Sequence, residues 1–312
     1  MILFSIAVHE RPEVVVNQVE NFTYFNPGCQ VVLHVSAWMP EDVFRVLQDA
    51  LSAYAHVHIN TTRLWSGYGD GTQMKMHVVN YSYARKLGLP FDYFCLHASN
   101  DMFVKAGLGN YMSAFDAGNN PVRIVWEDKR WAQSVHALSD RLLKKMMKKY
   151  GLSEIYGTQV EGSFYRKDIM DTVVSRIMKD GYYELPGIYA QGTSRPVSKI
   201  IEKREVRFLI KHLLKGMLYA KEETYFSTLS QDIVHNRAPY SYCYVNWLDN
   251  LKISRADIDN IREGNTGRLA LIGDIQLIAG QLQFFAVKRI DRKIDDPMRV
   301  YITGLQNTPL QV

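Results

Sequence analysis

Over the first hundred residues, short apolar runs alternate with segments in which apolar residues recur at helical spacing. The apolar runs lie at residues 2–8, 30–35, 57–60 and 91–97. A continuous apolar run without polar alternation is typical of a strand that is covered on both faces. The segments between the runs predict helices at residues 12–20, 40–55 and 74–86. Strands that alternate with helices indicate an α/β fold with a mostly parallel central sheet.

Polar side chains follow three of these predicted strands. His9 follows the first strand, Ser36 the second, and Asn100 and Asp101 the fourth. The carboxyl ends of parallel strands meet at one edge of a sheet, and ligands of open α/β sheets bind beyond that edge. We therefore expect these side chains to lie together there.

The second half of the chain is less regular. We expect a basic amphipathic helix over residues 139–150, a second over residues 205–219 and another helix over residues 222–233. Residues 269–278 and 283–287 are apolar, and their periodicity leaves helix and strand open. No repeat or linker divides the sequence, so we expect a single domain over residues 1–312.

Composition narrows the class of protein. The 312 residues carry 37 basic and 32 acidic side chains, a net charge of +5, which suits an anionic small ligand or surface more than a nucleic acid. Three scattered cysteines fit a reducing compartment better than a disulfide framework. No apolar run is long enough to span a bilayer, and the N-terminus lacks a basic signal-peptide region. We expect a cytoplasmic protein, or one that is peripheral on the inner membrane.

Three residues are candidates for binding phosphate groups, either through a metal or directly. Asp101 lies where paired carboxylates often hold a divalent metal, but a single carboxylate makes a poor metal site, and a helix N-cap before Met102 is the alternative. Without a metal, a diphosphate needs Lys or Arg. Lys288 ends an apolar stretch and Arg268 begins another; the alternative is that both are solvated charges.

Two further pairs of residues could contact or activate the acceptor in a sugar-transfer reaction. Glu222 and Glu223 precede an aromatic pair, and one such carboxylate could remove the proton of an acceptor hydroxyl; the alternative is an acidic first helical turn. Glu127 and Trp247 could contact a sugar, although isolated tryptophans are more often core residues. The histidines show no zinc-ligand spacing, and Walker A, Rossmann and nucleophile-elbow motifs are missing.

Taken in order, these segments resemble the core-2/I-branching β-1,6-N-acetylglucosaminyltransferase and protein xylosyltransferase family. The similarity lies in Phe4-Ser-Ile-Ala-Val-His9, Val32-Leu-His-Val35, the Trp65 loop, Tyr93 to Asp101, Glu161-Gly-Ser-Phe-Tyr165, Glu222 to Thr228, Tyr244-Val-Asn-Trp247 and Leu282 to Lys288. It spans most of the chain. Ser36 stands where the family usually has Asp, and the membrane anchor of the animal enzymes is missing, as expected for a compact bacterial relative.

The resemblance implies a GT-A-like fold, with a nucleotide-binding half at about residues 1–120 and an acceptor and catalytic half at about residues 121–312. It also implies inverting, metal-independent transfer. Glu223 would be the catalytic base, and Lys288 with Arg268 the diphosphate clamp. On the donor side it implies Ala7, His9, Ser36, Asn100 and Asp101, and on the acceptor side Glu127 and Trp247.

The sequence as a whole predicts a glycosyltransferase without a cofactor or metal. It would move N-acetylglucosamine or a related sugar from a UDP-sugar to a glycan or lipid-linked acceptor in bacterial surface-polysaccharide or lipopolysaccharide synthesis. A different stereochemistry or a metal requirement is an alternative within this class. The alternative outside it is a non-catalytic carbohydrate- or nucleotide-binding protein. Expected partners are a sugar nucleotide, the acceptor and possible contact with an anionic membrane, but no nucleic acid.

Overall fold

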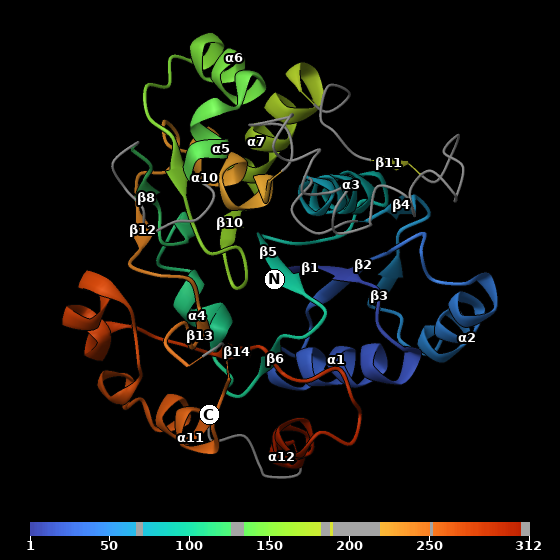
Figure 1. Cartoon of the computed structure of the whole chain (residues 1–312). Helices are drawn as coiled ribbons and strands as arrows, with labels where there is room; N and C mark the ends of the chain where they lie inside the picture. Colours follow the sequence, from blue (N-terminus) through green and yellow to red (C-terminus); the bar gives the residue numbers. More distant parts are fainter. Residues whose placement is uncertain (67–70, 126–133, 182–187, 190–218, 250–251, 307–312) are drawn as a thin grey trace, which may run out of the picture.

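A mostly parallel sheet forms the centre of the molecule (Figure 1). The computed structural model describes residues 1–66, 71–125, 134–181, 188–189, 219–249 and 252–306. The sheet has the order β12-β7-β10-β5-β1-β2-β3. Its strands are β1 (Ile2–Val8), β2 (Gln30–Val35), β3 (Val57–Ile59), β5 (Tyr93–Ala98), β7 (Ala117–Gly118), β10 (Phe164–Arg166) and β12 (Arg237–Ala238). Strands β3, β2, β1 and β5 are parallel, and β10 runs antiparallel to both of its neighbours. The predicted α/β class is confirmed.

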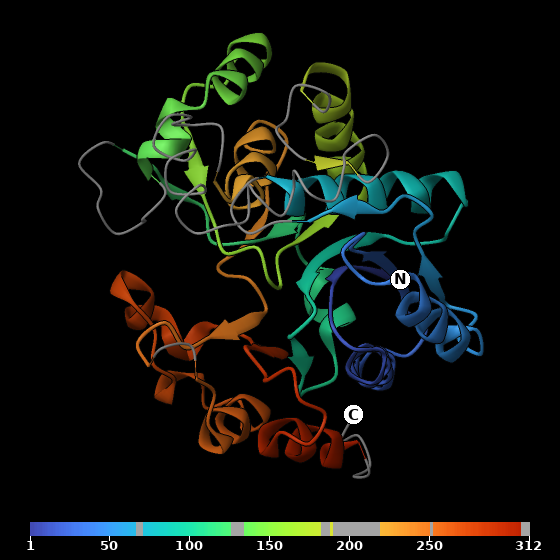
Figure 2. The same ribbon diagram turned by 45° about the vertical axis from the view of Figure 1, so that its right-hand side comes forward.

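Helices cover both faces of this sheet, as the apolar strands require. On one face lie α3 (Thr72–Lys86) and α7 (Lys167–Asp180), and on the other lies α1 (Pro12–Phe25), with α12 (Pro297–Leu305) against its outer side (Figures 1 and 2). Helix α2 (Glu41–Leu51) packs beside α1 at the β3 edge. The helices predicted at residues 12–20, 40–55 and 74–86 are confirmed, with shifted ends.

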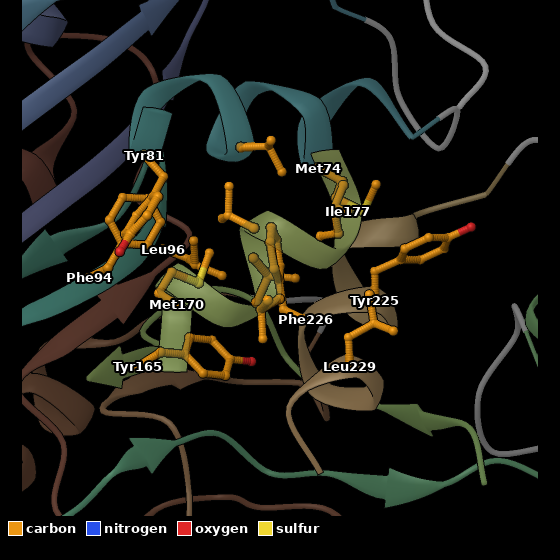
Figure 3. Close-up of a cluster of buried hydrophobic side chains, with 14 of the residues drawn as sticks. Met74, Tyr81, Phe94, Leu96, Tyr165, Met170, Ile177, Tyr225, Phe226 and Leu229 are labelled. Atoms are coloured by element: carbon orange, nitrogen blue, oxygen red, sulfur yellow. The ribbon is translucent and has the colours of Figure 1, made fainter. Parts of the chain in front are cut away.

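Each face of the sheet has its own apolar core. Figure 3 shows the core under α3 and α7, where Met74 and Tyr81 of α3 meet Met170 and Ile177 of α7. A second core joins β1 and β2 to α1, with Phe4, Phe22 and Phe103 packed edge to face. Burying a large apolar side chain contributes about 1.5–3 kcal/mol to the free energy of folding, so these two cores stabilise the sheet against its helices.

A small second sheet lies next to the carboxyl edge of β5. It has the order β13-β14-β6, formed by β13 (Cys243–Val245), β14 (Ala286–Lys288) and β6 (Met102–Phe103). Figure 2 shows this C-terminal part on the side of α1 and away from α7. Because Met102 begins a strand, the alternative that Asp101 is a helix N-cap is wrong.

The remaining elements are short. They are β4 (Leu64–Trp65), α4 (Leu108–Met112), β8 (Val122–Arg123), α5 (Ser134–Ser139), β9 (Tyr156–Gly157), β11 (Ile188–Tyr189), α11 (Arg255–Glu263) and the 3-10 helix η2 (Thr266–Arg268). The segment expected to be one helix over residues 222–233 is instead the 3-10 turn η1 (Lys221–Glu223) followed by α10 (Tyr225–Leu229). The two undecided apolar segments contain the 3-10 helix η3 (Gly273–Gln281) and the start of β14.

The predicted basic helix is present as α6 (Arg141–Tyr150). Its apolar side chains Leu143, Met146 and Met147 are buried in the core, while its lysines point outward. The apolar face is thus occupied within the molecule. The second predicted basic helix lies outside the described residues, apart from Tyr219. In the part of the chain that the structure describes, no helix is long and apolar enough to cross a bilayer.

Candidate active site

Parallel pairing brings the predicted donor residues to one edge of the sheet. Ala7 aligns with Ala98 across β1 and β5, so the residues after each strand emerge side by side. The amide of Ser36 donates to the carbonyl of Val8 (2.8 Å), which places Ser36 next to the end of β1. Their roles in donor binding remain predictions.

Ser36 lies in a corner with two tryptophans. Its hydroxyl accepts hydrogen bonds from Ser66 (2.7 Å) and from the amide of Trp38 (3.3 Å). The Trp38 indole donates to the carbonyl of Ser66 (2.9 Å) and meets Trp65 edge to face, with 4.4 Å between ring centroids. An aromatic wall beside a small hydroxyl suits a flat ring with polar edges.

Beside Ser36, a buried carboxylate lies at the end of β1. Glu10 accepts a hydrogen bond from Ser99 (2.7 Å), and Arg292 (2.8 Å) and His9 (3.2 Å) also contact its carboxylate. The pKa of His9 is lowered, because burial outweighs the attraction of Glu10, with Arg292 adding to the lowering. His9 therefore offers a neutral imidazole at neutral pH, and the cation at this position is Arg292.

Lys288 emerges from β14 and forms an ion pair with Glu161. Their side chains are 11% and 18% exposed, so both charges are largely removed from water. Burial alone would lower the pKa of Lys288, but the charges of Glu161 and Asp101 outweigh it and raise the pKa. Burial likewise would raise the pKa of Glu161, and Lys288 outweighs it, so that pKa is lowered. Both groups are charged at neutral pH.

Asp101, whose charge acts on Lys288, is fully buried. Its Oδ2 contacts His97 Nδ1 (2.9 Å) and accepts from the amide of Ala98 (3.0 Å), and His97 Nε2 meets the hydroxyl of Tyr242 (2.6 Å). Asp101 Oδ1 has no hydrogen-bond partner among the described residues. Asp101 thus acts on Lys288 through its charge. Its neighbour Asn100 accepts a hydrogen bond from the amide of Ile290 (2.9 Å), which ties β5 to the segment after β14.

The half-buried Glu223 is held by its neighbours on the η1 turn. Its carbonyl accepts a hydrogen bond from the amide of Thr158 (2.8 Å). Lys221, two residues earlier, forms a buried ion pair with Asp140, the N-cap of α6. The aliphatic part of the Lys221 side chain packs against Gly71, which has φ of 81°. A Cβ at this position would lie only 2.9 Å from Lys221 Cδ. The turn is therefore anchored on two sides.

Residues 158–161 connect this turn to the Lys288 pair and to Trp247. The side-chain Nε2 of Gln159 donates to the carbonyls of Glu161 (2.9 Å) and Cys243 (2.8 Å). Its Oε1 accepts a hydrogen bond from the indole of Trp247 (3.4 Å), which is 44% exposed. The predicted acceptor residue Trp247 and the predicted base Glu223 thus contact the same four-residue segment.

Two predicted residues are not part of this connected group. Arg268 is exposed on η2, and within the described residues no hydrogen bond or ion pair joins its side chain to this edge. Glu127 lies outside the described residues. Their roles stay predictions.

Glu161 and Asp140 were not predicted as site residues from the sequence. One signal was available for Glu161, namely the glycine that follows it. Gly162 has φ of 74°, and a Cβ there would lie 2.4 Å from the backbone nitrogen of Cys243. Such a close approach requires glycine and fixes Glu161 against β13.

The acidic and sulfur-containing side chains do not assemble into a metal site in the described part of the chain. No group of three or more His, Cys, Asp or Glu residues there is arranged to hold an ion. The three cysteines are free and buried.

Comparison with known proteins gave matches among solved structures alone. No family model matches the sequence, and no curated protein matches it. An active-site mutant of LgtC matches with a TM-score of 0.42 and 9% identity, covering 100% of this chain and 97% of that chain. A nucleoside-diphosphate-sugar pyrophosphorylase from Vibrio cholerae RC9 matches with a TM-score of 0.38 and 12% identity, over 76% of this chain and 90% of that chain. The mannosyltransferase Ktr4p from S. cerevisiae matches with a TM-score of 0.32 and 10% identity, over 73% and 65%. Similarity of this size does not show a family for the chain.

Proposed function

We propose that the chain is an inverting glycosyltransferase that uses a sugar nucleotide. The observation that carries the proposal is the segment 158–161, which joins the backbone of the proposed base to the side chains of Trp247 and Lys288. Thr158 binds the backbone of Glu223, Gln159 meets Trp247, and Glu161 pairs with Lys288. The residues proposed as base, acceptor platform and phosphate-binding cation are thus joined through one segment. In support of a ligand site, a hydrogen bond ties the segment after Lys288 to Asn100 beyond β5, and such folds bind ligands beyond the carboxyl ends of their strands.

In the proposed reaction, Glu223 removes the proton of an acceptor hydroxyl, and the oxygen attacks the anomeric carbon. The bond from that carbon to the diphosphate oxygen breaks as the new glycosidic bond forms on the opposite face. The bonding electrons pass to the diphosphate, where Lys288 balances the added negative charge. Arg268 is the second cation that the family resemblance implies for this role.

The donor is proposed to be a UDP-sugar carrying N-acetylglucosamine or a related sugar. In support, Trp38 and Trp65 form an aromatic surface next to the hydroxyls of Ser36 and Ser66, which suits the uracil ring of the donor nucleotide. The diphosphate would then reach Lys288, near Asn100 and Asp101. Trp247 and Glu127 would face a glycan or lipid-linked acceptor in bacterial surface-polysaccharide or lipopolysaccharide synthesis.

A panel of sugar nucleotides tests the donor class. A ligand that binds only the native protein raises its melting temperature by mass action, so the true donor should stabilise the protein most. Transfer or slow hydrolysis of that donor should follow, and the anomeric configuration of the product, read by NMR, should be inverted. Binding without any turnover would instead favour the non-catalytic alternative.

The Glu223→Gln variant tests the base. The amide keeps the shape of the carboxylate but cannot accept a proton, so turnover should fall about a hundredfold or more while donor binding persists. Glu222→Gln is the matched control, one residue away on the same turn. If Glu222→Gln loses turnover and Glu223→Gln does not, the base is Glu222. If neither variant matters, the catalytic proposal is wrong.

A further inference from the structure

The Glu161–Lys288 pair has an arrangement that suits exchange of one anion for another. Lys288 is the last residue of β14, and Glu161 lies in the turn three residues before β10 begins, so the two charges come from segments far apart in the sequence. Glu161 is the carboxylate that pairs with the Lys288 ammonium group in the structure.

We propose that Glu161 is the resident counter-ion of Lys288, which the diphosphate of the nucleotide displaces when it binds. This inference rests on the proposed function. Buried charges are tolerated when they are paired, and breaking a buried pair is costly. The Glu161 carboxylate therefore keeps Lys288 charged and ordered in the free protein. When the ligand replaces this carboxylate, Lys288 is already charged and does not have to be protonated.

The surroundings of Glu161 determine what happens after displacement. The charged and titratable groups that interact with the pair are Arg289 after β14, Asp101 after β5, His77 of α3 and Cys243 of β13. His97 of β5 contacts Asp101 and interacts with His77. Arg289 is exposed and lies beside the pair, so an approaching anion meets a cation first. Asp101 and the bound diphosphate are both negative.

Once Lys288 faces the diphosphate, Glu161 is a buried carboxylate beside negative groups. Burial and like charges both favour the protonated form of a carboxyl group. In the free protein Lys288 holds the pKa of Glu161 below its ordinary value, so Glu161 is ionised. Binding therefore takes up a proton. By linkage, affinity should fall as pH rises, by up to about tenfold per pH unit where Glu161 is ionised free and protonated in the complex.

Isothermal titration calorimetry with UDP, in two buffers of different ionisation enthalpy, measures this proton directly. We expect the wild type to take up about one more proton than Glu161→Gln, because ionisation of the nucleotide is common to both and cancels. Both titrations are made at about pH 6.5, well below the ordinary lysine pKa of about 10.4, where Asp101 still helps to keep Lys288 protonated in the variant. There the variant should bind UDP about tenfold tighter, since no ion pair has to be broken, a difference of about 1.4 kcal/mol. Lys288→Ala should weaken UDP far more than uridine.

Two further variants complete the test. Lys293→Ala, at an exposed position in the segment after β14, is the matched control and should bind as the wild type does. If Glu161→Gln does not fold, the double variant Glu161→Gln/Lys288→Met removes both charges of the buried pair and should bind UDP weakly without the extra proton.

The outcomes separate this inference from the proposed function. UDP binding and sugar transfer with equal proton uptake in wild type and variant would overturn the inference alone. Weaker UDP binding by Glu161→Gln would also overturn it, because Glu161 would then help to hold the ligand. Failure of every sugar nucleotide and of UDP to bind the wild type would overturn the proposed function, and this inference with it.

Discussion

Asp140→Ala should destabilise the protein by about 4–6 kcal/mol, because one carboxylate serves two separate structures. Its Oδ1 caps α6, accepting from the amides of Leu142 (2.9 Å) and Leu143 (3.1 Å). Its Oδ2 accepts from the hydroxyls of Tyr219 (3.0 Å) and Tyr225 (2.9 Å) and pairs with the ammonium group of Lys221.

The magnitude has two parts. Losing an N-cap costs about 1 kcal/mol. Breaking a buried ion pair by removing one partner costs about 3–5 kcal/mol, because a charge is left uncompensated. Lys221 is 1% exposed, so water cannot replace Asp140 without local opening. We add nothing for the two tyrosines, since groups that share one acceptor are not additive.

The pH dependence gives an independent check. Burial lowers the pKa of Lys221, and Asp140 opposes that effect. Without Asp140 the pKa falls further, so the folded variant binds fewer protons than its unfolded chain, and its stability rises with pH. The difference from wild type should therefore shrink between about pH 7 and 10, as folded Lys221 loses its proton while unfolded lysine keeps it.

Urea unfolding, followed by tryptophan fluorescence, measures both effects. Asp296→Ala is the matched control, because Asp296 caps α12 through the amides of Met298 and Arg299 (both 3.0 Å) and forms no ion pair within the described residues. It should cost about 1 kcal/mol. If Asp140→Ala costs no more than Asp296→Ala, the ion pair contributes nothing to stability and the reasoning is refuted.

Two further predictions concern ions and membranes. Transferase activity should survive excess EDTA, because Lys288 is proposed to supply the charge that a metal supplies in other enzymes; a strict requirement for manganese or magnesium would contradict this. Anionic vesicles should bind the protein weakly and lose it as salt is raised, since the apolar face of α6 is buried and only its cations can contribute, at about 1 kcal/mol each. Neutralising four exposed lysines should abolish sedimentation with the vesicles, and no binding at low salt would exclude this contact. These are Lys144, Lys145, Lys148 and Lys149.

The first half of the fold could be predicted because its signals are local. The apolar run of β1 and the helical spacing of α3 each reflect burial of one element on its own. The small sheet could not be predicted, since β13 and β14 are joined by pairing between distant segments. Likewise, Lys288 is 127 residues from Glu161, and no spacing rule connects them. The need for a cation near a diphosphate predicts a role for Lys288 from the sequence, but its pairing with Glu161 is seen only in the structure.

The reversed direction of β10 couples the site to the register of the sheet. Because β10 begins at the edge where β1, β2 and β5 end, the pairing of Phe164 with Cys95 also sets the position of Glu161. A slip by one residue would turn the buried Phe164 to the other face. A slip by two would keep the face but carry Glu161 about 7 Å along the strand, out of reach of Lys288. A register shift of β10 would therefore impair both folding and ligand binding. The ligand preference of the site can be changed without this cost only by side-chain substitutions that keep the register.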